Sequence, residues 1–350
     1  MPTSFFPSVV SFGDQQQGHI ILDKNNHEGF SQKMSNAIDV QEIDVNLYMS
    51  KQLWIPLGAR GVFGGEIVAQ SLRSAWNTVE EKFHIHSLHS YFILAGDYSV
   101  PVIYNVQRIR DGRSFATRLV IASQRGKPIF VCTCSFSTFS DAINIEHSVP
   151  MPSVPQPEEL LSDDQRVVKF LESRNDLPPS VREFLEKKVE EIQPVEYRDA
   201  RFEEPEDLFT GKLESNPVSR RWFKTREKVE SDDPKVHAGI VAYASDSGLL
   251  ATSLVANGIR IGSGDIGMMA SLDHSIWFHK PCRADDWLLH TMHSPRTSDG
   301  RGTNFGQIYS RDGTLVATTA QEGIIRLSKK GQKKFAEASQ QQNSDLNSKL

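Results

Sequence analysis

The spacing of apolar residues in the first half of the chain predicts a helix followed by a run of strands. After a glycine-rich turn at residues 61–65, apolar residues recur at helical spacing from Ile67 to Trp76. A strand-like run at residues 38–45 precedes this turn. Four more runs follow the helix, separated by short turns that contain glycine, at residues 86–94, 101–108, 115–123 and 129–136. This is the pattern of one core helix and an antiparallel meander.

The second half of the chain repeats this order. We expect a strand at residues 222–230, a helix from Val236, and strands at residues 270–278, 287–293, 304–309 and 315–327. Short stretches also align, SLHS at 87–90 with SLDHS at 271–275 and IFVCTC at 129–134 with LVATTA at 315–320. The sequence therefore predicts a duplicated unit in which a curved antiparallel sheet wraps a helix. That is an α+β fold of two tandem hot-dog units, whose sheets can pair edge to edge.

The composition of the remaining segments predicts how these units are connected. Four prolines between positions 150 and 157 mark a linker, and a charged, helix-prone stretch at 163–191 follows it. The expected organisation is a poorly ordered lead at 1–36, a first unit at 37–140, a Pro-rich and helical linker at 141–191, a second unit at 192–327 and a flexible tail at 328–350.

Charge and cysteine content exclude several classes of function. A net charge of -5 argues against a nucleic-acid-binding surface. Three cysteines without a C-x-x-C pair indicate neither a disulfide framework nor a zinc site, so we expect no metal and no cofactor. The apolar stretch at 239–259 contains Asp246 and Asn257, so it is interpreted as buried helix rather than as a membrane span.

The chain ends in Ser348, Lys349 and Leu350, the tripeptide that serves as a peroxisomal import address. The residues before it are rich in Lys, Gln and Ser, and were expected to leave the terminus accessible to a receptor. The sequence therefore predicts the peroxisomal matrix as location and the import receptor as a partner.

Six phrases in order resemble the acyl-CoA thioesterase II family of double hot-dog hydrolases, over most of residues 37–327. They are VFGG at 62–65, HSLHSYF at 86–92, RDGRSF at 110–115, GKPIF at 126–130, LDHSIWFH at 272–279 and QEG at 321–323. Together with the terminal tripeptide, they make the chain similar to a peroxisomal eukaryotic member. The resemblance implies hydrolysis of fatty acyl-CoA to free fatty acid and CoA thiol.

The resemblance also implies which residues act, namely Asp246, Ser271 and Gln321 around one water. Thioester hydrolysis needs a positioned water, a base for its proton and donors for the oxyanion. Asp246 is the expected base, while the Ser271 hydroxyl and the Gln321 amide can each donate and accept. Backbone N–H groups at the start of the first core helix, where Gly64 and Gly65 allow close approach, could bind the oxyanion.

Basic residues in the glycine turns are the candidate contacts for the CoA phosphates, because guanidinium groups match phosphate geometry. These are Arg110, Arg113, Arg296 and Arg301.

Other interpretations remain open from the residues alone. Asp246 lies in a Ser-Asp-Ser cluster that would also cap a helix. His274 and His279 are interpreted as structural histidines rather than metal ligands or a Ser-His-Asp set. A non-catalytic acyl-CoA-binding protein and a hot-dog enoyl-CoA hydratase are the alternative functions, although no convincing Asp/His pair at short spacing on one loop supports the latter.

The duplication is uneven in its chemistry. In the alignment above, Ser87 and Ser135 of the first unit correspond to Ser271 and Gln321 of the second, and Val62 stands where Asp246 would fall. We therefore expect one competent catalytic set per chain, and a homodimer or higher oligomer.

Overall fold

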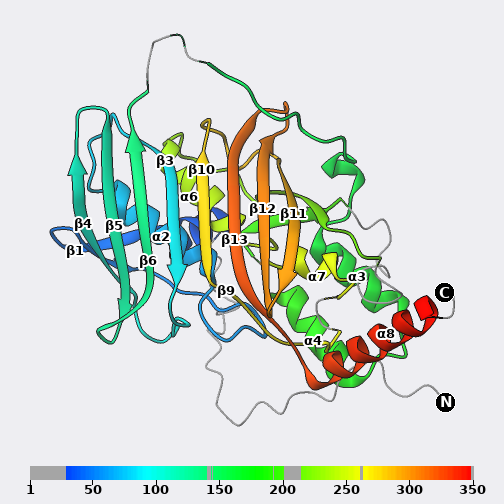
Figure 1. Cartoon of the computed structure of the whole chain (residues 1–350). Coiled ribbons are helices and arrows are strands. Elements are labelled where there is room, and N and C mark those ends of the chain that lie inside the picture. The colour runs from blue at the N-terminus through cyan, green and yellow to red at the C-terminus, as the bar shows by residue number, and fades with distance from the viewer. Residues whose placement is uncertain are drawn as a thin grey trace.

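The described part of the chain forms one long antiparallel sheet wrapped around two central helices (Figure 1). The structure is a computed structural model that describes residues 29–139, 143, 145–191, 193–200, 214–260 and 263–347. Its sheet has 13 strands. Those of the first half, in spatial order, are β1 (Val40–Asp44), β2 (Leu47–Ser50), β4 (Ile103–Asp111), β5 (Phe115–Gln124), β6 (Lys127–Ser137) and β3 (His84–Phe92).

The strands of the second half repeat this order in reverse. After β3 come β10 (Asp273–Phe278), β13 (Leu315–Leu327), β12 (Arg301–Ser310), β11 (Leu288–Ser298), β8 (Val218–Thr225) and β7 (Val195–Asp199), while β9 (Ile266–Ser271) also pairs with β13. The halves meet where β3 pairs with β10, His89 facing Ser275 and Leu88 facing Ile276. Each half hides the other's open strand edge. The expected tandem arrangement is confirmed.

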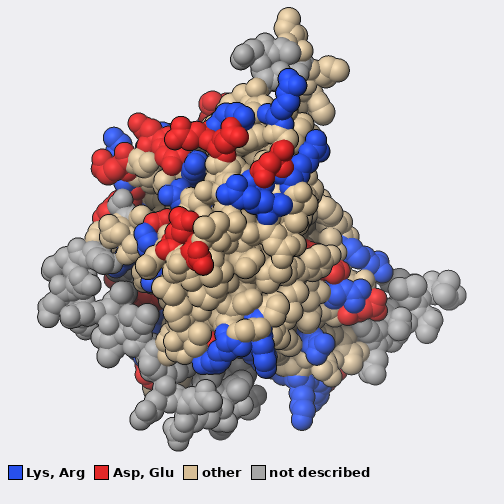
Figure 2. Space-filling view, turned by 90° about the vertical axis from the view of Figure 1, so that its left-hand side faces the viewer, with Lys and Arg blue, Asp and Glu red and all other residues tan. Residues whose placement is uncertain are grey.

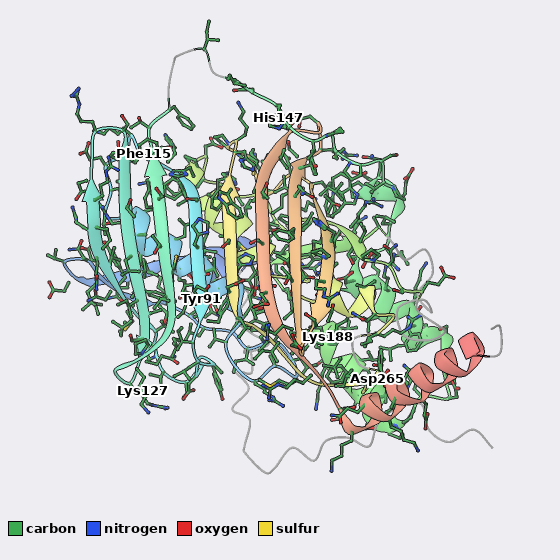
Figure 3. All side chains as sticks on the ribbon, in the orientation of Figure 1. Tyr91, Phe115, Lys127, His147, Lys188 and Asp265 are labelled. Carbon is green, nitrogen blue, oxygen red and sulfur yellow. The ribbon has the colours of Figure 1, made fainter. Side chains whose placement is uncertain are left out.

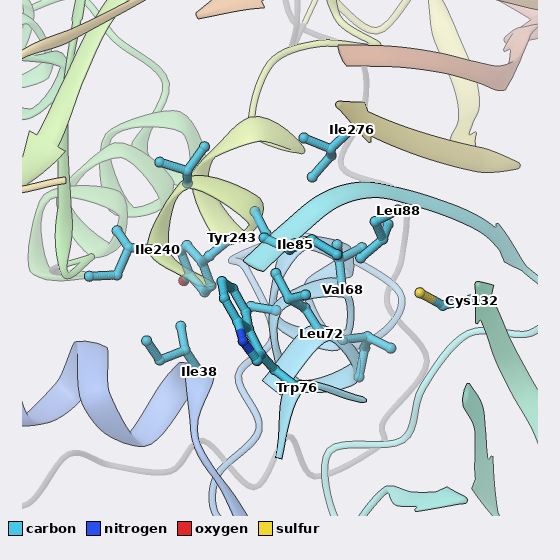
Figure 4. Close-up of a cluster of buried hydrophobic side chains, with 14 of the residues drawn as sticks. Ile38, Val68, Leu72, Trp76, Ile85, Leu88, Cys132, Ile240, Tyr243 and Ile276 are labelled. Carbon is cyan, nitrogen blue, oxygen red and sulfur yellow. The ribbon is translucent and has the colours of Figure 1, made fainter. Parts of the chain in front are cut away.

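The two central helices are α2 (Gly64–Trp76) and α6 (Pro234–Ser245), which pack on each other beneath the seam. A Cβ at Gly65 would lie only 2.2 Å from the backbone oxygen of Tyr243, so the helices can approach this closely only with glycine there. Apolar side chains from both helices and from the seam strands fill the core (Figure 4), including Val68, Leu72, Trp76, Ile240, Tyr243, Ile85, Leu88 and Ile276.

The edge strand β1 shows how the sheet ends. Apart from Val40, its residues are exposed and include Glu42 and Asp44. Charges on an edge strand oppose pairing with a further strand. Figure 2 shows the molecule from the left-hand side of Figure 1, where Lys and Arg as well as Asp and Glu side chains lie around a large area of other residues.

The linker forms a short 3-10 turn, η1 (Pro157–Glu159), and two helices, α3 (Asp163–Ser173) and α4 (Pro179–Glu190). Ser162 caps α3 by accepting from the backbone N–H of Gln165. Val167, Phe170, Leu177 and Leu185 make a small core between the helices. At the right of Figure 1 they lie beside the second half of the sheet, where α3 contacts β7.

Both ends of the described chain are more ordered than expected. The lead was predicted to be irregular up to residue 36, but α1 (Phe30–Ile38) is a helix, because Met34, Ala37 and Ile38 are buried in the core. Residues 1–28 and the tripeptide Ser348, Lys349 and Leu350 lie outside the described residues.

The tail was predicted to be flexible from residue 328, but α8 (Lys329–Asn347) begins there. Its first turns are held by the buried Asp265, labelled in Figure 3. The Asp265 carboxylate accepts from Lys334 Nζ at 2.6 Å, and its backbone oxygen accepts from Ser328 N at 2.8 Å. The composition of the tail does not indicate this anchor, because Asp265 lies more than 60 residues before α8 in the sequence. No helix among the described residues has the length and apolar character needed to span a bilayer.

A buried histidine on β11 predicts how stability depends on pH. Burial, followed by the charges of His274 and Arg221, lowers the pKa of His290 to about 3. The unfolded chain takes up this proton near pH 6.5, so it binds more protons than the folded chain between those values. The free energy of unfolding should therefore fall as pH decreases from about 6.5, with His290 contributing up to about 1.4 kcal/mol per pH unit.

Urea unfolding at several pH values would check this. His290→Gln should show a shallower decline below pH 6.5 than the wild type. An unchanged slope would contradict the assignment.

Candidate active site

Asp246 lies at the end of α6, as its C-cap residue. The chain turns away at Gly248, whose φ of +83° is accessible to glycine at little cost. The turn leaves the carboxylate beside the start of α2, where a Cβ on Gly64 would lie 2.8 Å from Asp246 Oδ2. Among the described residues, Glu66 N donates to Phe63 O at 3.2 Å, whereas the N–H groups of Gly64 and Gly65 have no backbone partner, so this end of α2 presents donors next to Asp246.

Gln321 on β13 is bonded directly to Asp246. Its Nε2 donates to Asp246 Oδ1 at 2.6 Å. The residue is 1% exposed, and its Oε1 is buried with no hydrogen-bond partner among the described residues. A buried acceptor without a partner is costly, which makes a bound water the natural partner for this oxygen.

A β-bulge opposite Gln321 separates β9 from β10, which the sequence predicted as one strand. On β13, Gly323 faces Ser271 and Ala320 faces Ser275, so three residues on one side oppose two on the other. The Asp273 carboxylate accepts from Glu322 N at 2.7 Å and so stabilises the bulge. The extra residue shifts the alternation of side chains, which brings Ser271 and His274 to the same face of the sheet.

Asp246, Ser271 and Gly64 line one cavity of about 460 Å³. Its walls come from the loop before α2, the turn after α6, strands β7, β8 and β9, and the linker helices. The remaining lining residues include Pro56, Val62, Asp163, Lys188, Glu191, Tyr197, Arg221, Arg226, Leu250 and Met269. Both halves and the linker therefore contribute to one cavity. Lys188, one of its lining residues, is labelled in Figure 3 and shows where in the molecule the cavity lies.

Arg221 on β8 and Arg226 directly after it, which the sequence did not single out, hold the linker over the cavity. Arg221 is paired with Asp163 and Arg226 with Asp164, both at the start of α3. Arg221 also stacks 4.0 Å from the Tyr197 ring, and burial raises the pKa of that tyrosine to about 12. These pairs join segments far apart in the chain, and no local motif marks them.

The four arginines predicted to contact CoA phosphate lie elsewhere. Arg110 and Arg113 are exposed near the β4–β5 turn, and Arg296 and Arg301 are exposed on the β11–β12 hairpin. None is among the residues that line the cavity in the described part of the chain. Arg301 is bonded to Glu322, the neighbour of Gln321, at 3.1 Å. Their role in CoA binding stays a prediction. Of the two predicted glycines, Gly64 lies in the cavity wall and Gly65 at the helix contact.

The pairing of strands shows what occupies the equivalent place in the first half. Gln321 faces Asn304 on β12, whereas Cys134 faces Arg118 on β5 and Leu88 on β3. A half-turn centred on the seam pair His89–Ser275 exchanges Leu88 with His274. Cys134 faces Leu88 as Gln321 lies beside His274, so Cys134 is the counterpart of Gln321, one residue from the Ser135 that sequence alignment chose. Buried side chains occupy every second position of a strand, so an error of one residue selects a side chain on the other face. Between their regularly paired residues, the turns that follow β5 and β12 differ by one residue, which an alignment without gaps does not detect.

Arg118 fills that counterpart site. It is 1% exposed, and it donates to Thr78 Oγ1 at 2.7 Å and to Thr78 O at 3.0 Å. Thr78 follows Asn77, the C-cap of α2, as Ser247 follows Asp246. In Figure 3, Phe115 marks the start of β5 near the top of the molecule, whereas Lys188, on α4 beside the cavity, lies lower in the view.

Among the described residues no group of three or more His, Cys, Asp or Glu side chains could hold a metal ion. His279 bonds to Thr318 Oγ1 at 2.8 Å, while His274 contacts Gln321 and Ser245.

Comparison with known proteins gives matches along most of the chain. Family models described as the acyl-CoA thioesterase N-terminal domain and C-terminal domain match residues 52–137 and 170–325. The mouse protein acyl-coenzyme A thioesterase 8 is 38% identical over 315 residues, covering 90% of this chain and 94% of that protein. The crystal structure of acyl-CoA thioesterase II TesB2 from Mycobacterium marinum has a TM-score of 0.64 and 32% identity, covering 85% of this chain and 98% of that one.

A more distant relative is named peroxisomal acyl-coenzyme A thioester hydrolase 1, from Saccharomyces cerevisiae. It is 25% identical over 314 residues, which cover 77% of this chain and 87% of that protein.

The tight fit of Gly64 predicts a loss of catalytic rate on adding one methyl group. In Gly64→Ala the Cβ would meet Asp246 Oδ2 at 2.8 Å and Phe92 Cε1 at 3.0 Å, so the carboxylate must move. Because small displacements of reacting groups are costly, kcat for thiol release should fall by about tenfold or more.

Gly239→Ala is the matched control, since its Cβ would make only ordinary contacts with Ile38, at 3.5 Å from Cδ1 and 3.9 Å from Cβ. That variant should keep wild-type kcat and gain up to about 1 kcal/mol of stability from better helix propensity. Equal kcat values in the two variants would refute the prediction that a methyl group on Gly64 displaces the Asp246 carboxylate and so lowers the rate.

Proposed function

Since the chain belongs to the acyl-CoA thioesterase II family, we propose that one water held by Asp246, Gln321 and Ser271 carries out its reaction. The enzyme hydrolyses acyl-CoA thioesters to free acid and CoA thiol. The observation that carries the proposal is the 2.6 Å hydrogen bond from Gln321 to Asp246, a residue that lines the cavity, with Gln321 Oε1 buried and without a hydrogen-bond partner among the described residues.

In this mechanism Asp246 Oδ2 takes a proton from the water as the water oxygen attacks the thioester carbonyl carbon. Gln321 Oε1 accepts the second hydrogen of the water, and the Ser271 hydroxyl fixes its position. The oxyanion is stabilised by the free N–H groups at the start of α2, around Gly64 and Gly65. The C–S bond then breaks, and the proton on Asp246 passes to the departing thiolate. No covalent acyl-enzyme forms.

We propose a single catalytic set per chain. The first half has Leu88 and Cys134 where the second has His274 and Gln321, and the Arg118 guanidinium fills the space. An apolar pair gives a water no hydrogen-bond partners, and a buried arginine held by backbone oxygens cannot act as a base. The role of the first half is therefore to support the cavity through α2 and its preceding loop.

Replacing Asp246 tests both statements. Asp246→Asn removes the base but keeps the shape and the bond partner of Gln321, so thiol release from a long-chain acyl-CoA should fall by about 100-fold to 10,000-fold. Because only one set is active, no residual half-activity should remain.

Asp299→Asn is the control, because Asp299 is exposed in a turn with a φ of 51°, which asparagine also adopts. It should behave as wild type. Retention of half the rate in Asp246→Asn would mean that the first half is also active, and an undiminished rate would remove Asp246 from the mechanism.

We further propose that the enzyme works in the peroxisomal matrix and is delivered there by the receptor that reads Ser348, Lys349 and Leu350. The name of the yeast relative supports the location. A homodimer or higher oligomer is the expected assembly in solution.

Deletion of Leu350 should move a fluorescently tagged enzyme from peroxisomes to the cytosol, with thiol release by the purified protein unchanged. Imaging beside a peroxisomal marker gives the answer. Continued import of the shortened protein would show that another segment carries the address.

A further inference from the structure

A chain of buried hydrogen bonds connects the end of α6 to the amide of Gln321. His274 Nδ1 lies 3.3 Å from Gln321 Nε2, and His274 Nε2 lies 2.9 Å from Ser245 Oγ. Ser245 Oγ in turn donates to the backbone oxygen of Ala242 at 2.9 Å. Ser245, His274 and Gln321 are each 1% exposed or less, so water does not compete for these bonds.

The direction of each bond follows from the number of protons available. The only hydroxyl proton of Ser245 is used on Ala242, so Ser245 must accept from His274 and Nε2 carries the ring proton. Nδ1 of the neutral ring is then an acceptor. One atom of the Gln321 amide therefore faces two acceptors, His274 Nδ1 and Asp246 Oδ1, and must be the NH2 group.

We propose that Ser245 and His274 are positioning residues that fix the Gln321 amide with its oxygen turned toward the attacking water. This inference rests on the proposed role of Gln321. Without His274, only Asp246 would hold the amide, which could then rotate out of the plane that aims Oε1 at the water. The bond at Nδ1 uses the second amide hydrogen and so restrains rotation.

The first half of the chain shows that the fold itself does not require a histidine at this position. The seam pairs Leu88 with Ile276, His89 with Ser275 and Ser90 with His274, and a half-turn centred on the middle pair exchanges Leu88 with His274. Leu88 is likewise fully buried, and it faces Cys134 as His274 lies beside Gln321. The second half, which holds the proposed catalytic set, thus has the polar pair His274 and Gln321. The first half has the apolar pair Leu88 and Cys134 at the corresponding place.

The protonation state of His274 agrees with this role. Burial lowers the pKa of its ring, opposed by the Asp246 carboxylate. A neutral ring keeps Nδ1 available as an acceptor, whereas an imidazolium would present a second donor to the Gln321 NH2 group.

Steady-state kinetics on His274→Leu, His274→Asn, Gln321→Ala and the His274→Leu/Gln321→Ala double variant test the proposal, with thiol release from a long-chain acyl-CoA as the assay. His274→Leu copies the residue of the first half and should lower kcat by about 100-fold while KM stays within about twofold. His274→Asn places a carbonyl oxygen near the position of Nδ1, so its kcat should recover to within about tenfold of wild type.

The double variant separates positioning from a general effect on the fold. If His274 acts through Gln321, then His274→Leu should cost nothing further in the Gln321→Ala background. Should His274→Leu not fold, Ser245→Ala releases the same restraint from the helix side, and its loss of kcat should also vanish in that background.

Wild-type kcat in His274→Leu, or in Ser245→Ala if that variant has to stand in, would overturn the inference, as would losses that multiply in the double variant. Wild-type kcat in Gln321→Ala would instead overturn the proposed function, so the two failures are distinguishable.

Discussion

The arrangement of the proposed catalytic site depends on the close approach of α2 and α6 at Gly65. With the backbone of Tyr243 against Gly65, the start of one helix lies beside the end of the other. The start of α2 offers free N–H groups, and the end of α6 carries Asp246 one residue beyond the last turn. Backbone packing alone thus brings the proposed base next to the proposed oxyanion donors.

The sheet completes the site through an irregularity rather than through its regular pattern. The bulge after Ser271 lets Ser271 and His274 face the helices together, and the Asp273 carboxylate stabilises it by accepting from Glu322 N. In the first half the equivalent position keeps Leu88, and Arg118 occupies the space. The two halves therefore share one fold, but the second contains a polar site where the first is filled by the Arg118 side chain. The linker covers the cavity and is held there by the ion pairs of Arg221 and Arg226.

The sequence predicted the regular elements well because hydrophobic periodicity and glycine turns are local signals. Most strand positions and both central helices were predicted in this way, and the roles of Asp246, Ser271 and Gln321 were predicted from the family resemblance. The missed features depend on contacts between distant segments. No local pattern in the sequence marks the ion pair that anchors α8 at Asp265 or the ion pairs of Arg221 and Arg226 with the linker. The same holds for the buried position of Arg118 in the first half. Likewise, the correspondence of Cys134 with Gln321 appears only when the register of strand pairs is known.

The central claim is that water, and not Asp246 itself, attacks the thioester. A single-turnover reaction in H2¹⁸O, with enzyme in excess over acyl-CoA and mass analysis of the fatty acid, tests it most directly. Direct attack predicts that the acid from the first turnover carries one ¹⁸O atom and that the protein carries none. An unlabelled acid together with ¹⁸O in the side chain of Asp246 would contradict the account, since it would require a covalent acyl-aspartyl intermediate.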